Sequence, residues 1–140
     1  MKSPTTAMLL AAGLGTRMWP LTADKPKTLL HLERRPLIDH ILDRLEEAGV
    51  HRVVINTHWQ AEQIEAHLAE REGGADREGR LEFIFRPEAE LLDTGGAVAS
   101  ALAAGALGED PFYVVNSDVI WFNGPSVTLT RLAEAHDPTQ

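Results

Sequence analysis

Short apolar runs alternate with segments of helical spacing along the chain, and no other feature of the sequence constrains the fold so strongly. Residues 7–12 form an unbroken run of small and apolar side chains, which is typical of a strand buried on both faces. Residues 36–48 carry apolar side chains at helical spacing and are followed by Gly49, a residue suited to a helix C-cap. The same patterns predict strands over residues 52–56, 81–85 and 112–115, helices over 60–71, 94–104 and 126–135, and an exposed loop over 72–80.

Strands that alternate with helices imply a mostly parallel sheet joined by right-handed crossovers. We therefore expect an α/β fold, a Rossmann-like three-layer sandwich with a mostly parallel sheet between two layers of helices. In such folds ligands bind outside the carboxyl ends of the strands. This rule selects four loops, which begin at Gly13, Asn56, Pro87 and Asn116.

The loop after the first predicted strand is rich in glycine and carries one arginine and two lysines. Gly13 and Gly15 allow a backbone with φ > 0 and a close approach to a ligand, so that N–H groups can converge on an anion. Arg17 adds a permanently charged, forked donor that suits phosphate oxygens. The segment is about 15 residues long, and loops of that length in a compact domain are usually functional or disordered. We expect this one to be ordered and to bind phosphate.

Two familiar glycine-loop signatures do not fit this segment. A dinucleotide-binding turn needs a third glycine where this chain has Met18, and Pro20 and Pro26 interrupt any helix that follows. A P-loop needs Gly-Lys-Ser or Gly-Lys-Thr at the start of a helix, and the loop has neither.

Composition narrows the class of ligand. The 140 residues are 44% hydrophobic, which suffices for one core and one ordinary domain. The net charge of −8 argues against a surface that tracks nucleic acid, so the bases around the loop suit a phosphorylated small molecule accompanied by a divalent cation. The chain has no cysteine, which excludes a disulfide framework and a thiolate nucleophile, and it has no apolar run of membrane-spanning length. We expect a soluble, cytoplasmic protein without nucleic-acid or membrane partners.

Five short motifs follow one another along the chain: Leu-Ala-Ala-Gly-Leu-Gly-Thr-Arg-Met (10–18), Pro-Leu-Thr (20–22), Pro-Lys (26–27), Leu-Asp-Thr-Gly-Gly-Ala (92–97) and Val-Val-Asn-Ser-Asp-Val (114–119). In these motifs the sequence resembles the sugar-1-phosphate nucleotidyltransferases. Within that family it is most similar to the N-acetylmuramate-1-phosphate uridylyltransferases of bacterial cell-wall recycling, and the mannose-1-phosphate guanylyltransferases are the alternative. The resemblance implies the nucleotide-diphospho-sugar transferase type of the fold. It also implies a reaction in which a nucleoside triphosphate, with UTP favoured, and a sugar 1-phosphate form a nucleotide-sugar and release pyrophosphate.

The resemblance assigns roles to the glycine loop and to the lysine that follows it. It implies that the triphosphate is held through the backbone of Ala11, Ala12, Gly13, Gly15 and Thr16. Arg17 would neutralise the leaving pyrophosphate, and Lys27 would lie between the reacting phosphates.

The resemblance also assigns a metal ligand. Asp118 would bind Mg²⁺, since a hard cation prefers carboxylate oxygen, and Asn116 would lie beside it near the nucleoside. On local sequence alone Asp118 is also compatible with a carboxylate that stabilises a turn at a strand end.

The base is expected at the turn before the third helix. By resemblance, Thr94, Gly95 and Gly96 would present backbone N–H groups to the base, and Glu88 would accept a hydrogen bond from a ring N–H. Two structural readings stay open, in which the glycines serve helix packing and Glu88 is a solvated side chain.

The family's chain is longer than 140 residues, and the resemblance implies that its remaining part supplies further strands, most of the sugar pocket and a second magnesium-binding aspartate. Residues 1–140 are therefore expected to be the N-terminal, nucleotide-binding part of the domain. Their incomplete sheet would pack against a second copy or against a missing C-terminal segment. The alternative of another class is a non-catalytic nucleotide-binding or regulatory module. Arg17, Lys27 and Asp118 together favour the enzyme, because a binding module has little need of all three charges.

Overall fold

The computed structural model describes residues 3–72, 81–137 and 139, and its centre is a sheet of four parallel strands in the order β5-β4-β1-β6. The strands are β1 (Thr6–Leu10), β4 (Arg52–Thr57), β5 (Glu82–Pro87) and β6 (Tyr113–Asn116). The helices are α1 (Leu37–Glu47), α2 (Ala61–Glu72), α3 (Thr94–Ala103) and α4 (Thr128–Glu134). The predicted alternation of strands and helices is confirmed; residues 73–80 of the predicted loop lie outside the described residues.

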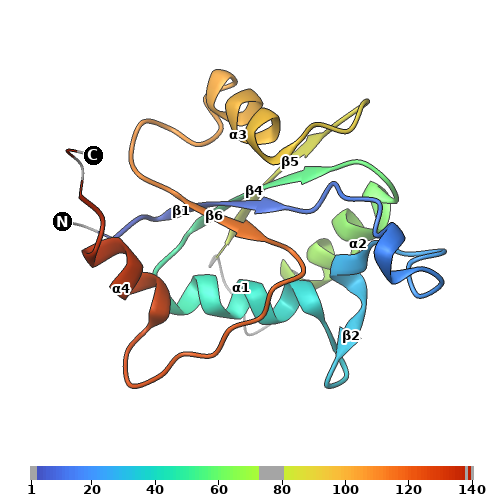
Figure 1. The fold of residues 1–140 in the computed structure, drawn as a ribbon, viewed down its shortest axis with the longest axis horizontal. Helices are drawn as coiled ribbons and strands as arrows, with labels where there is room; N and C mark the ends of the chain where they lie inside the picture. Colours follow the sequence, from blue (N-terminus) through green and yellow to red (C-terminus); the bar gives the residue numbers. More distant parts are fainter. Residues whose placement is uncertain (1–2, 73–80, 138, 140) are drawn as a thin grey trace.

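The sheet lies between two layers of helices, with α3 on one face and α1, α2 and α4 on the other (Figure 1). Successive side chains of the central strand β1 serve the two faces in turn, as the two-residue period of a strand requires. Ala7 and Leu9 belong to the core beneath α1, and Met8 belongs to the core beneath α3. All three side chains are fully buried. The expected three-layer α/β sandwich is thus confirmed.

Helix α1 supplies the largest share of the core on its face of the sheet. Ile38, Ile41, Leu42 and Leu45 are fully buried, and each such side chain contributes roughly 1.5–3 kcal/mol relative to exposure. The helix ends at Glu47, and Gly49 follows its C-cap Ala48 with φ of 86°, the left-handed conformation that commonly closes a helix, as predicted.

Two parts of the observed backbone differ from the sequence-based expectation. Strand β1 ends at Leu10 rather than at residue 12, because the next N–H, that of Ala11, donates to the side chain of Asn56 at 2.8 Å. A short antiparallel pair, β2 (His31–Leu32) and β3 (Arg35–Pro36), was not predicted. Its turn places Glu33 and Arg34 at φ values of 51° and 70°, positions where turns usually signal themselves with glycine or asparagine.

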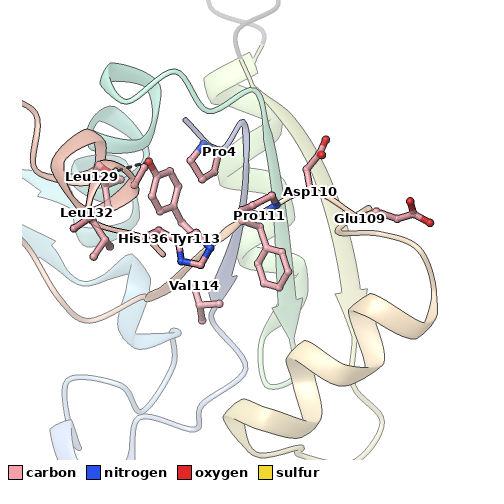
Figure 2. Close-up of a pocket in the computed structure, with 12 residues that line it drawn as sticks. Pro4, Glu109, Asp110, Pro111, Tyr113, Val114, Leu129, Leu132 and His136 are labelled. Carbon is pink, nitrogen blue, oxygen red and sulfur yellow. Dashed lines mark hydrogen bonds between the residues drawn. The ribbon is translucent and has the colours of Figure 1, made fainter. Parts of the chain in front are cut away.

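The outer edge of the sheet at β6 carries an apolar groove, which we call the edge groove and define by Phe112, Tyr113, Val114, Leu132 and His136. Figure 2 shows Tyr113 reaching from β6 towards α4, where its hydroxyl donates to the carbonyl of Leu129 at 2.9 Å. The groove measures about 610 Å³ and lies at the amino end of β6, away from the strand-end loops selected above. Within the described ranges β6 pairs with β1 alone, and Val114 is 46% exposed.

No described helix is both long enough and apolar enough to cross a lipid bilayer.

A charged network fastens α2 to α1. The guanidinium of Arg71 on α2 is only 7% exposed and lies 3.2 Å from Asp39, 2.9 Å from Asp43 and 3.3 Å from Glu46, all on α1. Asp43 also accepts from Arg35 at 2.8 Å. Burial alone would raise the pKa of the Asp43 carboxyl, but hydrogen bonds and charge from Arg71 and Arg35 outweigh burial and hold that pKa below its ordinary value.

Asp43→Asn should therefore destabilise the protein at neutral pH and much less in acid. A carboxyl whose pKa is lowered by folding stabilises the protein above its unfolded pKa of about 4, and this contribution disappears as the pH falls through the lower, folded value. We expect a loss of about 1–2 kcal/mol in the free energy of unfolding at pH 7, shrinking below about pH 4. Urea unfolding of the variant and the unchanged chain from pH 3 to pH 7 measures the loss of stability at neutral pH and its decrease in acid. Glu65→Gln, at an exposed position of α2, is the control, and a pH-independent loss in Asp43→Asn would contradict the prediction.

Candidate active site

The loops after all four parallel strands open at one edge of the sheet, as expected. In the pairing register, Leu10 of β1 stands opposite Asn56 of β4 on one side and Asn116 of β6 on the other. A cavity of about 310 Å³ lies at this edge. Its walls come from the ends of three strands, the glycine loop and the turn before α3, and they comprise Leu10, Ala12, Gly13, Lys27, Asn56, Leu91, Leu92, Asp93, Thr94 and Asn116.

Two of the predicted catalytic residues, 91 positions apart in the chain, form an ion pair beside this cavity; Lys27 lines the cavity, whereas Asp118 is not among its lining residues. Lys27 lies on the 3₁₀ turn η2 (Lys27–Leu29), and its ammonium is 3.2 Å from a carboxylate oxygen of Asp118, just beyond β6. The two side chains are 24% and 43% exposed. An ion pair so open to water contributes less than about 1 kcal/mol to stability. Its main physical consequence is that one cation and one carboxylate are held together at the cavity.

The two glycines of the loop act differently from each other. Gly15 has φ of 68°, and a Cβ there would lie 2.9 Å from the Cγ2 of Thr22, whose hydroxyl donates to the carbonyl of Gly15 at 2.6 Å. The prediction of φ > 0 is wrong for Gly13, which does not adopt the left-handed conformation. A Cβ at Gly13 would lie 3.5 Å from the nitrogen of Lys27, which is an ordinary van der Waals contact, so the space around this residue does not require glycine.

The N-terminus of α3 forms a second wall of the cavity. Asp93 is its N-cap, and the Asp93 carboxylate accepts the backbone N–H of Gly96. A Cβ on Gly96 would come within 2.9 Å of that carboxylate, so a larger residue here would make the Asp93 side chain shift. Thr94 lines the cavity, whereas Gly95 and Gly96 do not. The N–H of Gly96 is thus already bonded within the cap and is not available to a ligand.

A glycine loop, a lysine and a carboxylate around one cavity suit a polyphosphate, and comparison with known proteins agrees. The nucleotidyl transferase family matches residues 6–139. The chain belongs to this family. It is 45% identical over 139 residues to the N-acetylmuramate alpha-1-phosphate uridylyltransferase of Caulobacter vibrioides, over 98% of this chain and 55% of that protein.

Other nucleotidyl transferases are similar over the same region. The mannose-1-phosphate guanylyltransferase catalytic subunit beta of Drosophila pseudoobscura pseudoobscura is 40% identical over 116 residues, which cover 83% of this chain and 30% of that protein. A crystal structure of UDP-glucose pyrophosphorylase complexed with UDP-glucose superposes with a TM-score of 0.79 at 22% identity, over 94% of this chain and 52% of the other, and shows that the fold is shared. The chain thus spans about half the length of the uridylyltransferase and less of the guanylyltransferase.

The remaining predicted residues of this nucleotidyl transferase's glycine loop lie outside the cavity walls. Ala11 is buried, and its N–H is taken by the Asn56 side chain at 2.8 Å, so it does not point to a ligand. Thr16 and Arg17 lie on the exposed 3₁₀ turn η1 (Thr16–Met18). Among the described residues the Arg17 guanidinium forms neither an ion pair nor a hydrogen bond, which leaves it open to an anion.

Glu88 is not the solvated side chain of the structural reading. One of its oxygens accepts from the Asn56 amide at 3.0 Å, and the other accepts from the backbone N–H of Leu92, also at 3.0 Å. Glu88 and Asn56 also line a neighbouring cavity of about 430 Å³. Asn56 was predicted only as the start of a loop; an amide side chain that ends a buried strand was the signal for a larger role.

The implied Mg²⁺ can be tested against the side chains present. Within the part of the chain that the structure describes, no three histidine or acidic residues are grouped as metal ligands. Asp118 offers one carboxylate, 43% exposed and facing Lys27. Magnesium is commonly held by one or two carboxylates, with substrate phosphates and water as further ligands, so Asp118 fits a metal that arrives with a nucleotide.

Gly15→Ala should distort the glycine loop beyond the ordinary cost of a left-handed alanine. Strain in that conformation costs about 1–2 kcal/mol, and the clash with Thr22 adds about 1 kcal/mol or more. Gly49→Ala is the matched control, because Gly49 has φ of 86° but nothing within 4 Å of its added Cβ. Urea unfolding of both variants separates the cost of the left-handed conformation from the cost of the clash with Thr22. Equal losses of stability would mean that Thr22 does not constrain Gly15.

Proposed function

We propose that residues 1–140 form the nucleotide-binding part of a sugar-1-phosphate nucleotidyltransferase that uses UTP and N-acetylmuramate 1-phosphate. The observation that carries the proposal is the Lys27–Asp118 pair beside the glycine loop, at the carboxyl ends of parallel strands. Membership of the nucleotidyl transferase family and 45% identity to an N-acetylmuramate alpha-1-phosphate uridylyltransferase support it. A reaction that consumes UTP would take place in the cytoplasm, which is the location we propose.

The proposed reaction is an in-line displacement at phosphorus. An oxygen of the sugar phosphate forms a bond to the α-phosphorus of UTP, the bond from that phosphorus to the β-phosphate oxygen breaks, and pyrophosphate leaves. The attacking phosphate has a second pKa of about 6, so it is ionised at neutral pH and no general base is required. The chain's task is positioning and charge stabilisation, for which Lys27 lies at the reacting phosphates and Arg17 at the leaving pyrophosphate.

Asp118 would hold the magnesium ion, with Asn116 beside it. When bound, the ion supplies positive charge that offsets the triphosphate, which an acidic protein of net charge −8 needs. Lys27 and Asp118 would then exchange their mutual contact for phosphate and metal, respectively. A non-catalytic nucleotide-binding module remains the alternative of another class, but it would have little use for a cation and a carboxylate held together at the cavity.

The base would lie against the first turn of α3, where Thr94 and Gly95 offer N–H groups that face no other described acceptor. We favour uracil because the segment from Leu92 to Ala97 is similar to the uridylyl branch. The guanylyltransferase relative, at 40% identity, supports guanine as the alternative.

Calorimetry of the 140-residue chain with UTP and with GTP, each with and without magnesium, tests this function. We expect magnesium-dependent binding of UTP that is about tenfold or more tighter than binding of GTP. Tighter binding of GTP would transfer the assignment to the guanylyl branch, and no heat at millimolar concentrations of either nucleotide would refute the proposal.

Asp118→Asn serves as the variant in the same titration. It removes one ligand charge at nearly constant volume, so the dependence of UTP binding on magnesium should weaken. Asp110→Asn, at the edge groove on the opposite end of β6, is the control and should bind like the unchanged chain.

We propose further that in the isolated 140-residue chain a second copy covers the β6 edge, which in a longer family chain could instead be covered by a C-terminal segment. An edge strand presents unpaired N–H and C=O groups, and two copies of the same edge can pair around a twofold axis. Two exposed apolar side chains flank that edge, Val114 at 46% and Leu132 at 60% exposure. The 140 residues alone should make little or no nucleotide-sugar, since most of the sugar pocket is expected elsewhere in the longer family chain.

Leu132→Lys and Val114→Lys should therefore shift the chain from dimer to monomer. Sedimentation equilibrium over a range of concentrations measures the dissociation constant, which we expect to rise by about tenfold or more for each variant. Leu102→Lys is the control, because Leu102 is 44% exposed on α3, away from the edge groove. A wild-type chain that is monomeric at high concentration, or variants that associate as strongly as the wild type, would contradict the proposal.

A further inference from the structure

We infer that Asn56 is a positioning residue of the nucleotide site, and that it acts through Glu88. Together they would hold the glycine loop and the turn before α3 at one fixed separation, so that the phosphate side and the base side of the cavity fit the same nucleotide. The inference rests on the proposed nucleotide site, and its experiment is designed so that either can fail without the other.

A continuous relay of hydrogen bonds connects the two walls. The Asn56 side-chain oxygen accepts the N–H of Ala11 at 2.8 Å, and its amide nitrogen donates to Glu88 at 3.0 Å. The second carboxylate oxygen of Glu88 accepts the N–H of Leu92 at 3.0 Å. One side chain at the end of β4 is thereby joined to the loop after β1 and, through the loop after β5, to the segment that leads into α3.

Glu88 is itself fixed from the backbone side. Its N–H donates to the carbonyl of Thr57 at 2.7 Å, and its carbonyl lies 2.6 Å from a ring nitrogen of His58. The carboxylate can therefore transmit the position of β4 to Leu92, because neither end of the Glu88 residue is loose. The relay begins at residues of β4 that are paired in the strand ladder.

The hydrogen bonds of the relay begin where the backbone pairing of β1 with β4 ends. Beyond Leu10 the backbone of β1 has no further strand partner in β4. The side chain of Asn56, a residue that is only 4% exposed, bonds the next N–H in place of a backbone carbonyl. Ala12 and Gly13, which follow directly, line the cavity, as do Asn56 and Leu92 themselves. One end of the relay thus lies on the cavity wall at Leu92, and the other end, Ala11, directly precedes the wall residue Ala12. A small displacement of either end changes the shape of the site without opening the core.

The inference can be tested by exchanging the donor and the acceptor of the hydrogen bond between Asn56 and Glu88. In Asn56→Asp the side chain can still accept the N–H of Ala11. It loses the N–H that donates to Glu88, and it places a second carboxylate next to the carboxylate of Glu88. Adding Glu88→Gln supplies a donor from the other side, while the oxygen of the new amide still accepts from Leu92. The double variant thus restores every hydrogen bond of the relay with one bond reversed.

The experiment measures the dissociation constant for magnesium-UTP in the 140-residue chain, with the melting temperature of each variant recorded in parallel. We expect Asn56→Asp to weaken binding by about tenfold or more, and the double variant to return within about threefold of the unchanged chain. Asn123→Asp is the matched control: Asn123 donates to Glu47 at 2.6 Å in another asparagine–glutamate pair, away from the cavity, and its variant should bind UTP normally.

Three results would overturn the inference: unchanged affinity in Asn56→Asp, no recovery in a folded double variant, or an affinity that merely follows melting temperature across all variants. If the unchanged chain binds neither UTP nor GTP, the proposed function fails and the relay is judged by amide hydrogen exchange. Exchange at Ala11 and Leu92 should then accelerate in Asn56→Asp and recover in the double variant, and no change at those two amides would refute the relay itself.

Discussion

The parallel pairing of β1 with β4 on one side and β6 on the other is the constraint on which the rest of the structure depends. The three buried side chains at the middle of β1 anchor it in both cores, so it cannot shift along its neighbours without exposing one of them. That register places Asn56 and Asn116 on either side of Leu10. Every wall of the candidate site is attached, directly or through a short loop, to this row.

Side chains continue the organisation of the sheet beyond the point where its backbone bonds end. Asn56 bonds the first residue of the glycine loop and, through Glu88, the turn before α3. Lys27 reaches Asp118 from a different loop. The first set is buried or half-buried and bonded at both ends, whereas the Lys27–Asp118 pair is open to water. Such a division suits a site whose framework stays in place while its charged groups exchange partners with a ligand.

The acidic residues of this chain fall into two physical classes. Asp43 lies in a network with Arg71 and Arg35 that lowers its pKa and fastens two helices together, so its charge serves stability. Asp118 is partly exposed at the cavity with one lysine as partner, and its charge remains available to a cation. A net charge of −8 is thus compatible with the proposed phosphate-binding site, because the local arrangement of charges, rather than their sum, decides what a surface binds.

The sequence by itself determined the alternation of strands and helices, the parallel sheet and the edge at which the candidate site lies, because these follow from local periodicity and from the geometry of crossovers. It could not show that β1 stops at Leu10, that Gly13 avoids the left-handed conformation, or that Glu33 and Arg34 form a hairpin turn. It also could not show that the N–H groups of Ala11 and Gly96 are already bonded. The end of β1 and the two bonded N–H groups depend on side-chain acceptors, the Asn56 oxygen and the Asp93 carboxylate. Only the tertiary structure decided them, since hydrogen-bond partners and close contacts are set by packing between segments that the sequence leaves far apart.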